Sequence, residues 1–356
     1  MAGQQTTESD WSQEEIEAFQ SAITGWFQSE GKDLPWRRTT DPYRILVSEL
    51  MLQQTRVETV LKRGFYDRWL ETFPDAQSLA TAPEEAVLKA WEGLGYYNRA
   101  RNLQKAARVI VEDRNGEFPD SLEGMLELPG VGRYTAGAVL SFAFGKRAPL
   151  VDGNVARLFS RIFLMQAPID STAGKKRLWD LAEQMTPDRL VREYNSGLME
   201  IGQRFCRPGS NPDCSNCPIA VHCRGHEVGV DLGALPKKQG KIVIENKTED
   251  VGFFFQDDRI FLSQEQGSRR KGMWRLPSIV PRPGRKELFT VHYTITKYRV
   301  EMRVYKGVNE NLPERIQENG GWFEAPEETD SLAIPSPDRR ALKILIDGFI
   351  SGKGRK

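Results

Sequence analysis

All four cysteines of the chain lie within residues 206–223, at Cys206, Cys214, Cys217 and Cys223. In a reducing compartment such clustered thiols favour a metal site over disulfides. Their spacing, C-x7-C-x2-C-x5-C, differs from the two separated pairs of a zinc finger and from ferredoxin runs. We therefore expect a single loop gathered around a metal centre.

The apolar pattern changes once along the chain. From Trp11 to about Phe205 apolar residues recur every three to four positions, which predicts helices. One of these, YRILVSELMLQQ, is expected to start after the N-cap Asp41 with Pro42 in its first turn, and it contains Glu49.

Beyond residue 240 short apolar runs alternate with turns. VGFFF-QDD-RIFLS predicts a hairpin, and LFTVHYTITKYRVEMRVY predicts strands whose alternation changes phase at a bend or bulge. A final helix is expected from Pro337, with Ser336 as its cap. The chain is thus expected to be multidomain, with an α part and an α+β part.

The expected domain organisation follows from these changes of pattern. The parts are a flexible N-terminus (1–10), a helical domain (11–225), a linker (226–242), an α+β domain (243–350) and a basic tail (351–356).

Composition limits the classes of protein considered. Fifty Lys and Arg oppose 49 Asp and Glu, so any DNA binding must use a local basic face. No apolar stretch is long enough for a membrane helix, and the start lacks a signal or transit pattern. We expect a cytoplasmic monomer, associated with the nucleoid if bacterial.

Two motifs carry chemistry in the helical part. Leu128-Pro129-Gly130-Val131-Gly132 predicts a tight hairpin, with both glycines able to adopt positive φ and backbone N–H groups able to hold a phosphate. An ordinary helix connection fits this string about equally well. Further along, Asp152 precedes a helix, where by itself an N-cap role is sufficient.

Hairpin, Asp152 and cysteines in this order resemble the helix-hairpin-helix DNA glycosylase superfamily. The strings LPWR (34–37), VSELMLQQT (47–55) and GLGYY (93–97) resemble the adenine DNA glycosylase (MutY-type) family more closely. GMWRLP (272–277) and GWF (321–323) extend the resemblance over about residues 11 to 350.

This resemblance implies a fold, a substrate and a cofactor. The fold is an all-α helix-hairpin-helix glycosylase domain with an iron-sulfur loop, followed by a Nudix-like α+β domain. The substrate is double-stranded DNA containing an adenine:8-oxoguanine mispair, or less efficiently adenine:guanine. The four cysteines would hold a 4Fe-4S cluster, with zinc as the alternative. The family has six residues in the first gap, and the turn-forming stretch 207–213 absorbs the additional one.

The resemblance also assigns catalytic roles. Glu49 would be the general acid, with a pKa raised by its apolar surroundings, and Asp152 would stay ionised and stabilise or capture the oxocarbenium ion. Tyr134 and Asn154 would hydrogen-bond within this site. Endonuclease III-type relatives place a lysine where this chain has Tyr134, so a monofunctional hydrolase without a lyase step is implied.

Further positions match residues that bind DNA. Gln54 and Tyr96 match wedge positions, and Arg37 and Leu52 match the adenine pocket, although core packing would also account for Tyr96 and Leu52. Backbone contacts are expected from Gly130, Gly132, Arg207 and Arg224.

The expected bend in the second domain holds Thr296 and Lys297, where the family commonly has Phe-Ser-His. The Thr296 hydroxyl can hydrogen-bond 8-oxoguanine, whereas Lys297 lacks the flat imidazole of the family and suits a phosphate.

Two other classes of protein fit this sequence less well. An endonuclease III-type pyrimidine glycosylase/lyase is opposed by Tyr134 and by the second domain. A catalytically silent DNA-binding homologue is opposed by the presence of both acids. The second domain lacks an acidic Nudix box after GMWRLP, so recognition is expected there and pyrophosphate hydrolysis is not.

Overall fold

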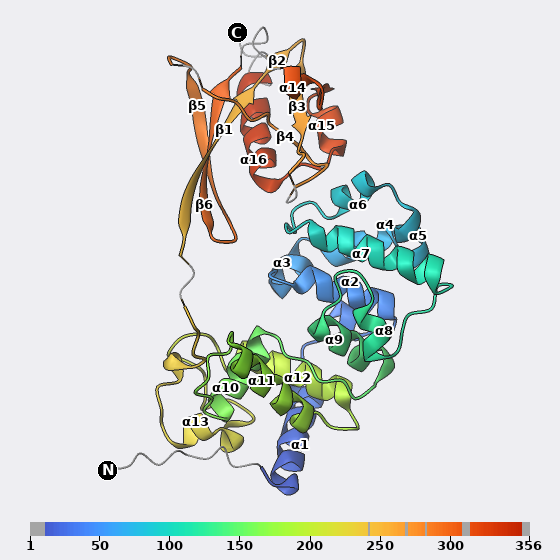
Figure 1. The fold of residues 1–356 in the computed structure, drawn as a ribbon, viewed down its shortest axis with the longest axis vertical. Coiled ribbons are helices and arrows are strands. Elements are labelled where there is room, and N and C mark those ends of the chain that lie inside the picture. The colour runs from blue at the N-terminus through green and yellow to red at the C-terminus, as the bar shows by residue number, and fades with distance from the viewer. Residues whose placement is uncertain (1–10, 241–242, 268–269, 282, 308–313, 351–356) are drawn as a thin grey trace. The chain divides into compact units, whose positions relative to one another are not determined.

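The structure, a computed structural model, describes residues 11–240, 243–267, 270–281, 283–307 and 314–350 (Figure 1). The chain divides into two compact units. Unit 1 comprises residues 1–53 and 112–241, and unit 2 comprises residues 54–111 and 242–356. The expected N-terminal segment 1–10 and basic tail 351–356 lie outside the described residues. The other expected domain boundaries remain predictions.

The described elements of unit 1 are all helical, as the periodicity predicts. They are α1 (Gln13–Glu30), η1 (Pro35–Arg37), α2 (Pro42–Leu52), α8 (Leu122–Leu126), α9 (Arg133–Phe144), α10 (Gly153–Ile162), α11 (Thr172–Met185), α12 (Val191–Arg204), η3 (Ala220–His222), α13 (Arg224–Glu227) and η4 (Leu232–Ala234). In this unit α1 packs on α12, α2 on α9, and α10 on α12.

Helix α2 begins as the sequence predicts. The Asp41 carboxylate accepts hydrogen bonds from the backbone N–H groups of Tyr43 and Arg44, and Pro42 occupies the first turn. All residues from Ile45 to Met51 are buried, so this helix is surrounded by protein on every side. Glu49 is therefore inside unit 1.

The hairpin between α8 and α9 differs in one detail from the expectation. Gly130 has a φ of 78°, but Gly132 is extended, with a φ of -95°. Gly132 is the N-cap residue of α9, and N-cap residues adopt extended backbone. The expectation that both glycines support the turn through positive φ is wrong for Gly132.

The segment expected to be a linker partly packs on unit 1. Helix α13 extends to Glu227, and Leu232 and Leu235 are buried. The guanidinium of buried Arg161 donates to the Leu235 carbonyl at 3.2 Å. The middle of this segment is therefore held against α10.

Unit 2 combines helices with two sheets. Its helices are α3 (Val57–Lys62), α4 (Phe65–Thr72), α5 (Ala76–Thr81), α6 (Glu84–Ala90), α7 (Asn98–Arg108), α14 (Glu314–Gln317), α15 (Glu327–Ser331), α16 (Ser336–Leu345) and η6 (Ile346–Ile350), while η2 (Val109–Asp113) spans the boundary with unit 1. Its strands are β1 (Glu245–Phe253), β2 (Phe255–Gln256), β3 (Arg259–Gln264), β4 (Trp274–Arg275), β5 (Glu287–Ile295), β6 (Tyr298–Lys306) and β7 (Gly320–Glu324).

The sheets confirm the hairpin expected at VGFFF-QDD-RIFLS, where β2 pairs with β3, and the strands expected within residues 288–305. One sheet has the order β1-β6-β5, with β1 parallel to β6 and β5 antiparallel to it, as Figure 1 shows. In the other sheet β3 pairs with β2, β4 and β7. Thr296 and Lys297 form the two-residue connection between β5 and β6, where Ile295 pairs with Tyr298. The change of phase in the sequence is thus the turn of a hairpin rather than a bulge.

Helix α16 closes the core of the β part. It packs on β5, and Ala341, Leu342 and Leu345 join the apolar core formed with strand residues such as Met302 and Val304. The helix starts at Ser336 with Pro335 as its N-cap residue, so the expected cap at Ser336 is wrong by one position. Pro335 is extended and supplies no side-chain cap, whereas Ser336 already belongs to the helix.

Among the described residues, no helix has both the length and the apolarity required to cross a bilayer.

Candidate active site

The most distinctive group in unit 1 is a buried carboxyl on α2. Glu49 is 5% exposed, and the Tyr134 hydroxyl on α9 donates to its Oε2 at 2.7 Å. Burial raises the pKa of Glu49 to about 7, against the opposing effects of the Tyr134 hydrogen bond and the Arg37 charge. The carboxyl therefore keeps its proton close to neutral pH, as a general acid requires.

Tyr134 remains a neutral donor in this pair. Burial raises its pKa well above the ordinary value for a tyrosine, and the charge of Glu49 adds to that effect. Its hydroxyl also lies 3.5 Å from the Met199 sulfur. Tyr134 therefore ties α9 to α2 without supplying an amine nucleophile.

The second carboxyl sits at the start of α10. Asp152 accepts hydrogen bonds from the backbone N–H groups of Asn154 at 2.9 Å and Val155 at 2.7 Å, and from the Asn154 side-chain amide at 2.8 Å. Burial nevertheless raises its pKa, and the hydrogen bonds only oppose that rise. The sequence argument anticipated the cap but not the effect of burial on this carboxyl.

Arg157 connects Asp152 to the cysteine loop, and sequence reasoning missed it. Its Nη2 donates to the Asn154 side-chain carbonyl at 2.9 Å and to the Gly202 carbonyl at 2.7 Å, and its Nε donates to the Cys206 carbonyl at 2.6 Å. The orientation of the Asn154 amide is thereby fixed, with its NH2 toward Asp152. The available signal was the i, i+3 spacing of Asn154 and Arg157 on one helix.

An ion pair between half-buried Arg37 and buried Glu200 lies near enough to Glu49 for the Arg37 charge to oppose the rise in its pKa. Arg37 in η1 lies 2.5 Å from the Glu200 carboxylate on α12, and its guanidinium stands 4.9 Å from the centre of the Phe27 ring. Glu200 is almost fully buried and also accepts from the Lys32 backbone N–H. Sequence reasoning included Arg37 but missed Glu200, whose only signal is its position among the apolar residues of α12.

The expected wedge and pocket residues divide between the units. Leu52, half-buried, is the last residue of α2 in unit 1. Gln54 and Tyr96 belong to unit 2, where both adopt positive φ, at 57° and 47°. Tyr96 is 44% exposed, so the alternative of core packing is wrong for this residue.

The four cysteines line one small cavity in unit 1. Cys206 is buried, and the Arg161 Nη1 lies 3.3 Å from its sulfur while Arg161 also donates to the carbonyls of Arg207 and Gly209. His226 lines the same cavity, whereas His222 packs against the rings of Trp11 and Phe19.

In the part of the chain that the structure describes, no three His, Cys, Asp or Glu side chains form a ready metal-ligating group.

Two expected backbone-binding arginines flank that cavity. Arg207 is exposed and lies 3.8 Å from the Asp213 carboxylate, and Arg224 is the half-buried first residue of α13. Arg207 lies within the cysteine loop, and Arg224 directly follows its last cysteine, Cys223. The expected glycines of the hairpin, Gly130 and Gly132, precede α9.

Unit 2 contains a cavity of about 730 Å³. Tyr96 and Thr296 both line it, together with Arg270, Tyr293 and Arg340. Lys297 is not among the described lining residues, and its ammonium group pairs with the Glu245 carboxylate instead. The cavity thus brings one expected wedge residue together with one of the two expected lesion-contacting residues.

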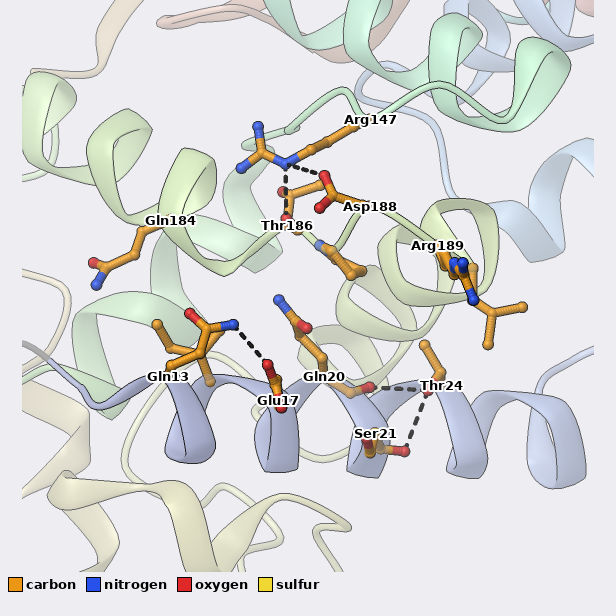
Figure 2. A pocket seen from close by; sticks show the side chains of 13 residues that line it. Gln13, Glu17, Gln20, Ser21, Thr24, Arg147, Gln184, Thr186, Asp188 and Arg189 are labelled. Carbon is orange, nitrogen blue, oxygen red and sulfur yellow. Dashed lines mark hydrogen bonds and ion pairs between the residues drawn. The ribbon is translucent and has the colours of Figure 1, made fainter.

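A separate polar hollow of about 490 Å³ lies along α1 in unit 1. Figure 2 shows the Arg147 guanidinium directed toward Asp188 and Thr186, with Gln13 hydrogen-bonded to Glu17 on the helix below. None of the residues expected at the active site lines this hollow. We assign it no part in the chemistry.

Comparison with known proteins gives a family for this arrangement. Residues 47–184 match the model of the HhH-GPD superfamily base excision DNA repair protein. The adenine DNA glycosylase of Homo sapiens is 42% identical over 222 residues, which cover 60% of this chain and 40% of that protein. The chain therefore spans less than half the length of the human relative.

A bacterial relative is covered more completely. The adenine DNA glycosylase of Buchnera aphidicola subsp. Baizongia pistaciae is 36% identical over 259 residues, which cover 72% of this chain and 71% of that protein.

Among solved structures, a thermostable thymine-DNA glycosylase is 34% identical with a TM-score of 0.56, over 62% of this chain and all of that one. A trapped endonuclease III-DNA covalent intermediate, 24% identical with a TM-score of 0.52 over 62% of this chain and 99% of that one, shows the same fold. The helical fold, the hairpin and the coverage of the bacterial relative together show that this chain belongs to the adenine DNA glycosylase family of the HhH-GPD superfamily.

Proposed function

We propose that this protein is a monofunctional adenine DNA glycosylase of base excision repair, which removes adenine mispaired with 8-oxoguanine, or less efficiently with guanine, and leaves an abasic site. The observation that carries the proposal is the pair of carboxyls in unit 1, of which Glu49 is buried and Asp152 is half-buried. Glu49 holds a proton near neutral pH, and Asp152 is surrounded by hydrogen-bond donors.

The two carboxyls divide the chemistry of breaking an N-glycosidic bond. Glu49 delivers a proton to the departing adenine, so that the base leaves as a neutral molecule. Asp152 stabilises the positive charge that grows on the sugar or captures the sugar carbon, and water completes the hydrolysis. The Asn154 and Val155 N–H groups hold the Asp152 carboxylate in place while this charge develops.

Tyr134 supports the absence of a lyase step. The side chain beside Glu49 is a phenol, and a phenol cannot form a Schiff base. Strand cleavage by an amine nucleophile depends on that Schiff base. We expect the abasic product to break only after alkali or heat. Borohydride trapping of a covalent adduct at the rate of base release would contradict this part of the proposal.

We further propose that the four cysteines hold a 4Fe-4S cluster, with zinc as the alternative. The donor set fits, because four thiols line one cavity and the Arg161 guanidinium stands beside the Cys206 sulfur. Such a group would supply folding energy to the loop that carries Arg207 and Arg224. Anaerobically purified protein should contain four iron atoms per chain, and one zinc instead would favour the alternative.

The α+β part of unit 2 is proposed to be a Nudix-like domain that recognises 8-oxoguanine. Thr296 and Tyr96 line the same cavity, which supports a shared role in reading the base opposite the target. Three carboxylates of this part, Glu249, Glu265 and Asp338, lie within 3.6 Å of the Arg275 guanidinium. Because these carboxylates are paired with Arg275, we favour a role in recognition over metal-dependent hydrolysis.

The decisive experiment measures single-turnover release of adenine from duplexes containing A:8-oxoguanine, A:guanine and A:T pairs. Asp152→Asn should abolish release and retain duplex binding. Asp41→Asn is the matched control, because Asp41 caps α2 in the same way but is not proposed to touch the substrate. Equal rates for the two variants, or no release by the unmodified protein, would reject the proposal.

Lesion preference is tested separately. Thr296→Ala should reduce the preference for 8-oxoguanine over guanine by about fivefold, the value of one hydrogen bond. Deletion of residues 241–356 should reduce it further while leaving some adenine removal. An unchanged preference in both variants would mean that this domain does not read the lesion.

A further inference from the structure

The connection between α6 and α7 is held in an uncommon backbone conformation. Gly93, Gly95 and Tyr96 all have positive φ, at 94°, 70° and 47°. Glycine adopts this region without penalty, but a tyrosine does so only where its surroundings enforce it. The exposed Tyr96 ring is therefore presented by a turn that needs external support.

Arg99 supplies much of that support. It is 8% exposed, and its Nη2 donates to the carbonyl oxygens of Leu94 at 2.9 Å and Gly95 at 3.0 Å. The Trp91 indole N–H also donates to the Gly95 carbonyl, at 3.1 Å. The guanidinium carbon lies 5.3 Å from the Trp91 ring centre and 5.7 Å from the Tyr96 ring centre.

The same guanidinium reaches a second segment. Thr55 Oγ1 lies 3.4 Å from Nη2 and 3.5 Å from Nη1 of Arg99. Thr55 directly follows Gln54, which is exposed and has a φ of 57°. One buried arginine thus connects the segment that presents Gln54 with the turn that presents Tyr96.

We infer that Arg99 is a positioning residue that fixes the spacing of Gln54 and Tyr96, so that both enter the duplex together. This inference rests on the proposed function, because it assumes that the two residues act as wedges. A planar guanidinium has donors directed at both segments, whereas a lysine ammonium is a single point and cannot span them in the same way. Burial keeps Arg99 from the phosphate backbone, so its role is geometric.

The test uses the full-length protein with Arg99→Lys and with Thr55→Val. Arg108→Lys is the matched control, because Arg108 is on the same helix and donates to the Ala80 carbonyl, outside the turn. Unstacking is followed by the fluorescence of 2-aminopurine beside the target adenine, and base release is followed on the same duplexes. A second duplex places the target adenine opposite an abasic site, where no base pair has to be broken and flipping costs less.

Arg99→Lys should lower unstacking and release in the fully paired duplex by about tenfold, and Thr55→Val by about threefold, from the hydrogen bonds lost. Both should retain near wild-type release in the duplex with the abasic site, and Arg108→Lys should match wild type throughout. Equal losses on both duplexes, or no loss in a folded Thr55→Val protein, would overturn the inference. If the unmodified protein releases no adenine, the proposed function fails, while the fluorescence still tests Arg99.

Discussion

Glu49 in unit 1 and Glu249 in unit 2 have the same kind of partner and opposite pKa shifts. Each accepts a hydrogen bond from a tyrosine hydroxyl, from Tyr134 at 2.7 Å and from Tyr293 at 2.9 Å. Burial raises the pKa of both carboxyls, but the net pKa of Glu249 is lowered because the Arg275 guanidinium lies 2.9 Å away. A phenol does not overcome the full burial of Glu49, whereas a phenol and a cation together outweigh the partial burial of Glu249. Asp338 is fully buried beside the same cation, and burial still raises its pKa.

The difference separates a carboxyl that can donate a proton from one that holds structure together. Arg275 is 7% exposed and also contacts Glu265 and the fully buried Asp338. These ion pairs join β1, β4, α16 and the residue that follows β3. Among the described residues, the hydrogen-bond partner of Glu49 is a tyrosine hydroxyl and not a cation, so its proton stays available.

The largest effect should distinguish the two glutamates directly. Glu49→Gln removes the proton donor and should lower single-turnover adenine release by roughly 100- to 10,000-fold. Glu249→Gln should leave the rate near that of the unmodified protein, because Glu249 is tied to Arg275. Comparable losses of activity in the two variants would mean that the pKa difference does not mark the catalytic acid.

Removal of the Arg275 cation should shift the pKa of Glu249 upward, toward the behaviour of Glu49. Arg275→Met removes the ion-pair partner of Glu249 and Glu265 in a partly buried position and should lower the free energy of unfolding by about 3 kcal/mol at pH 7. In the unmodified protein the lowered pKa of Glu249 and Glu265 gives stability that is lost as the pH falls toward 4.

The variant should show the opposite pH dependence. Its unpaired carboxyls would have raised pKa values, so its stability should rise as the pH is lowered from 7 to 5. Chemical denaturation across this range measures both slopes. Parallel slopes for the two proteins would show that Arg275 does not control the ionisation of this network.

The pH dependence of base release tests the raised pKa of Glu49 directly. Since its pKa is about 7 and the protonated form is active, the rate should fall as the pH rises above 7. Tyr134→Phe removes a hydrogen bond that lowers this pKa, so the falling limb should move to higher pH by up to about one unit. A limb that moves to lower pH would contradict the assigned effect of the tyrosine.

The smallest effect is expected at the ion pair of Lys297 and Glu245, which is exposed, in contrast to the buried Arg275 network. Lys297 pairs with Glu245, but the two side chains are 45% and 47% exposed. Water screens such a pair, so Lys297→Ala should leave the free energy of unfolding nearly unchanged. It should also leave the 8-oxoguanine preference within twofold, measured beside Thr296→Ala. A larger change in preference would place Lys297 at the lesion.

Local signals allowed the sequence to predict much of this protein. The predicted features depend on neighbours within a few residues: helical periodicity, the N-cap at Asp41, the hairpin between β2 and β3, and the clustering of the cysteines. The motifs that carry the family resemblance are equally local. For this reason Glu49, Asp152 and Tyr134 could be named before their surroundings were known.

Contacts between distant residues were decided only by the tertiary structure. Arg157 meets Cys206 across 49 positions, Arg37 meets Glu200 across 163, and Arg275 meets Asp338 between β4 and α16. Which buried carboxyl has a cation beside it is a property of packing, and no local pattern encodes it. The sequence determined which acids this protein possesses, and the fold determined which of them keeps a proton, because a pKa depends on desolvation and on charges brought near in space.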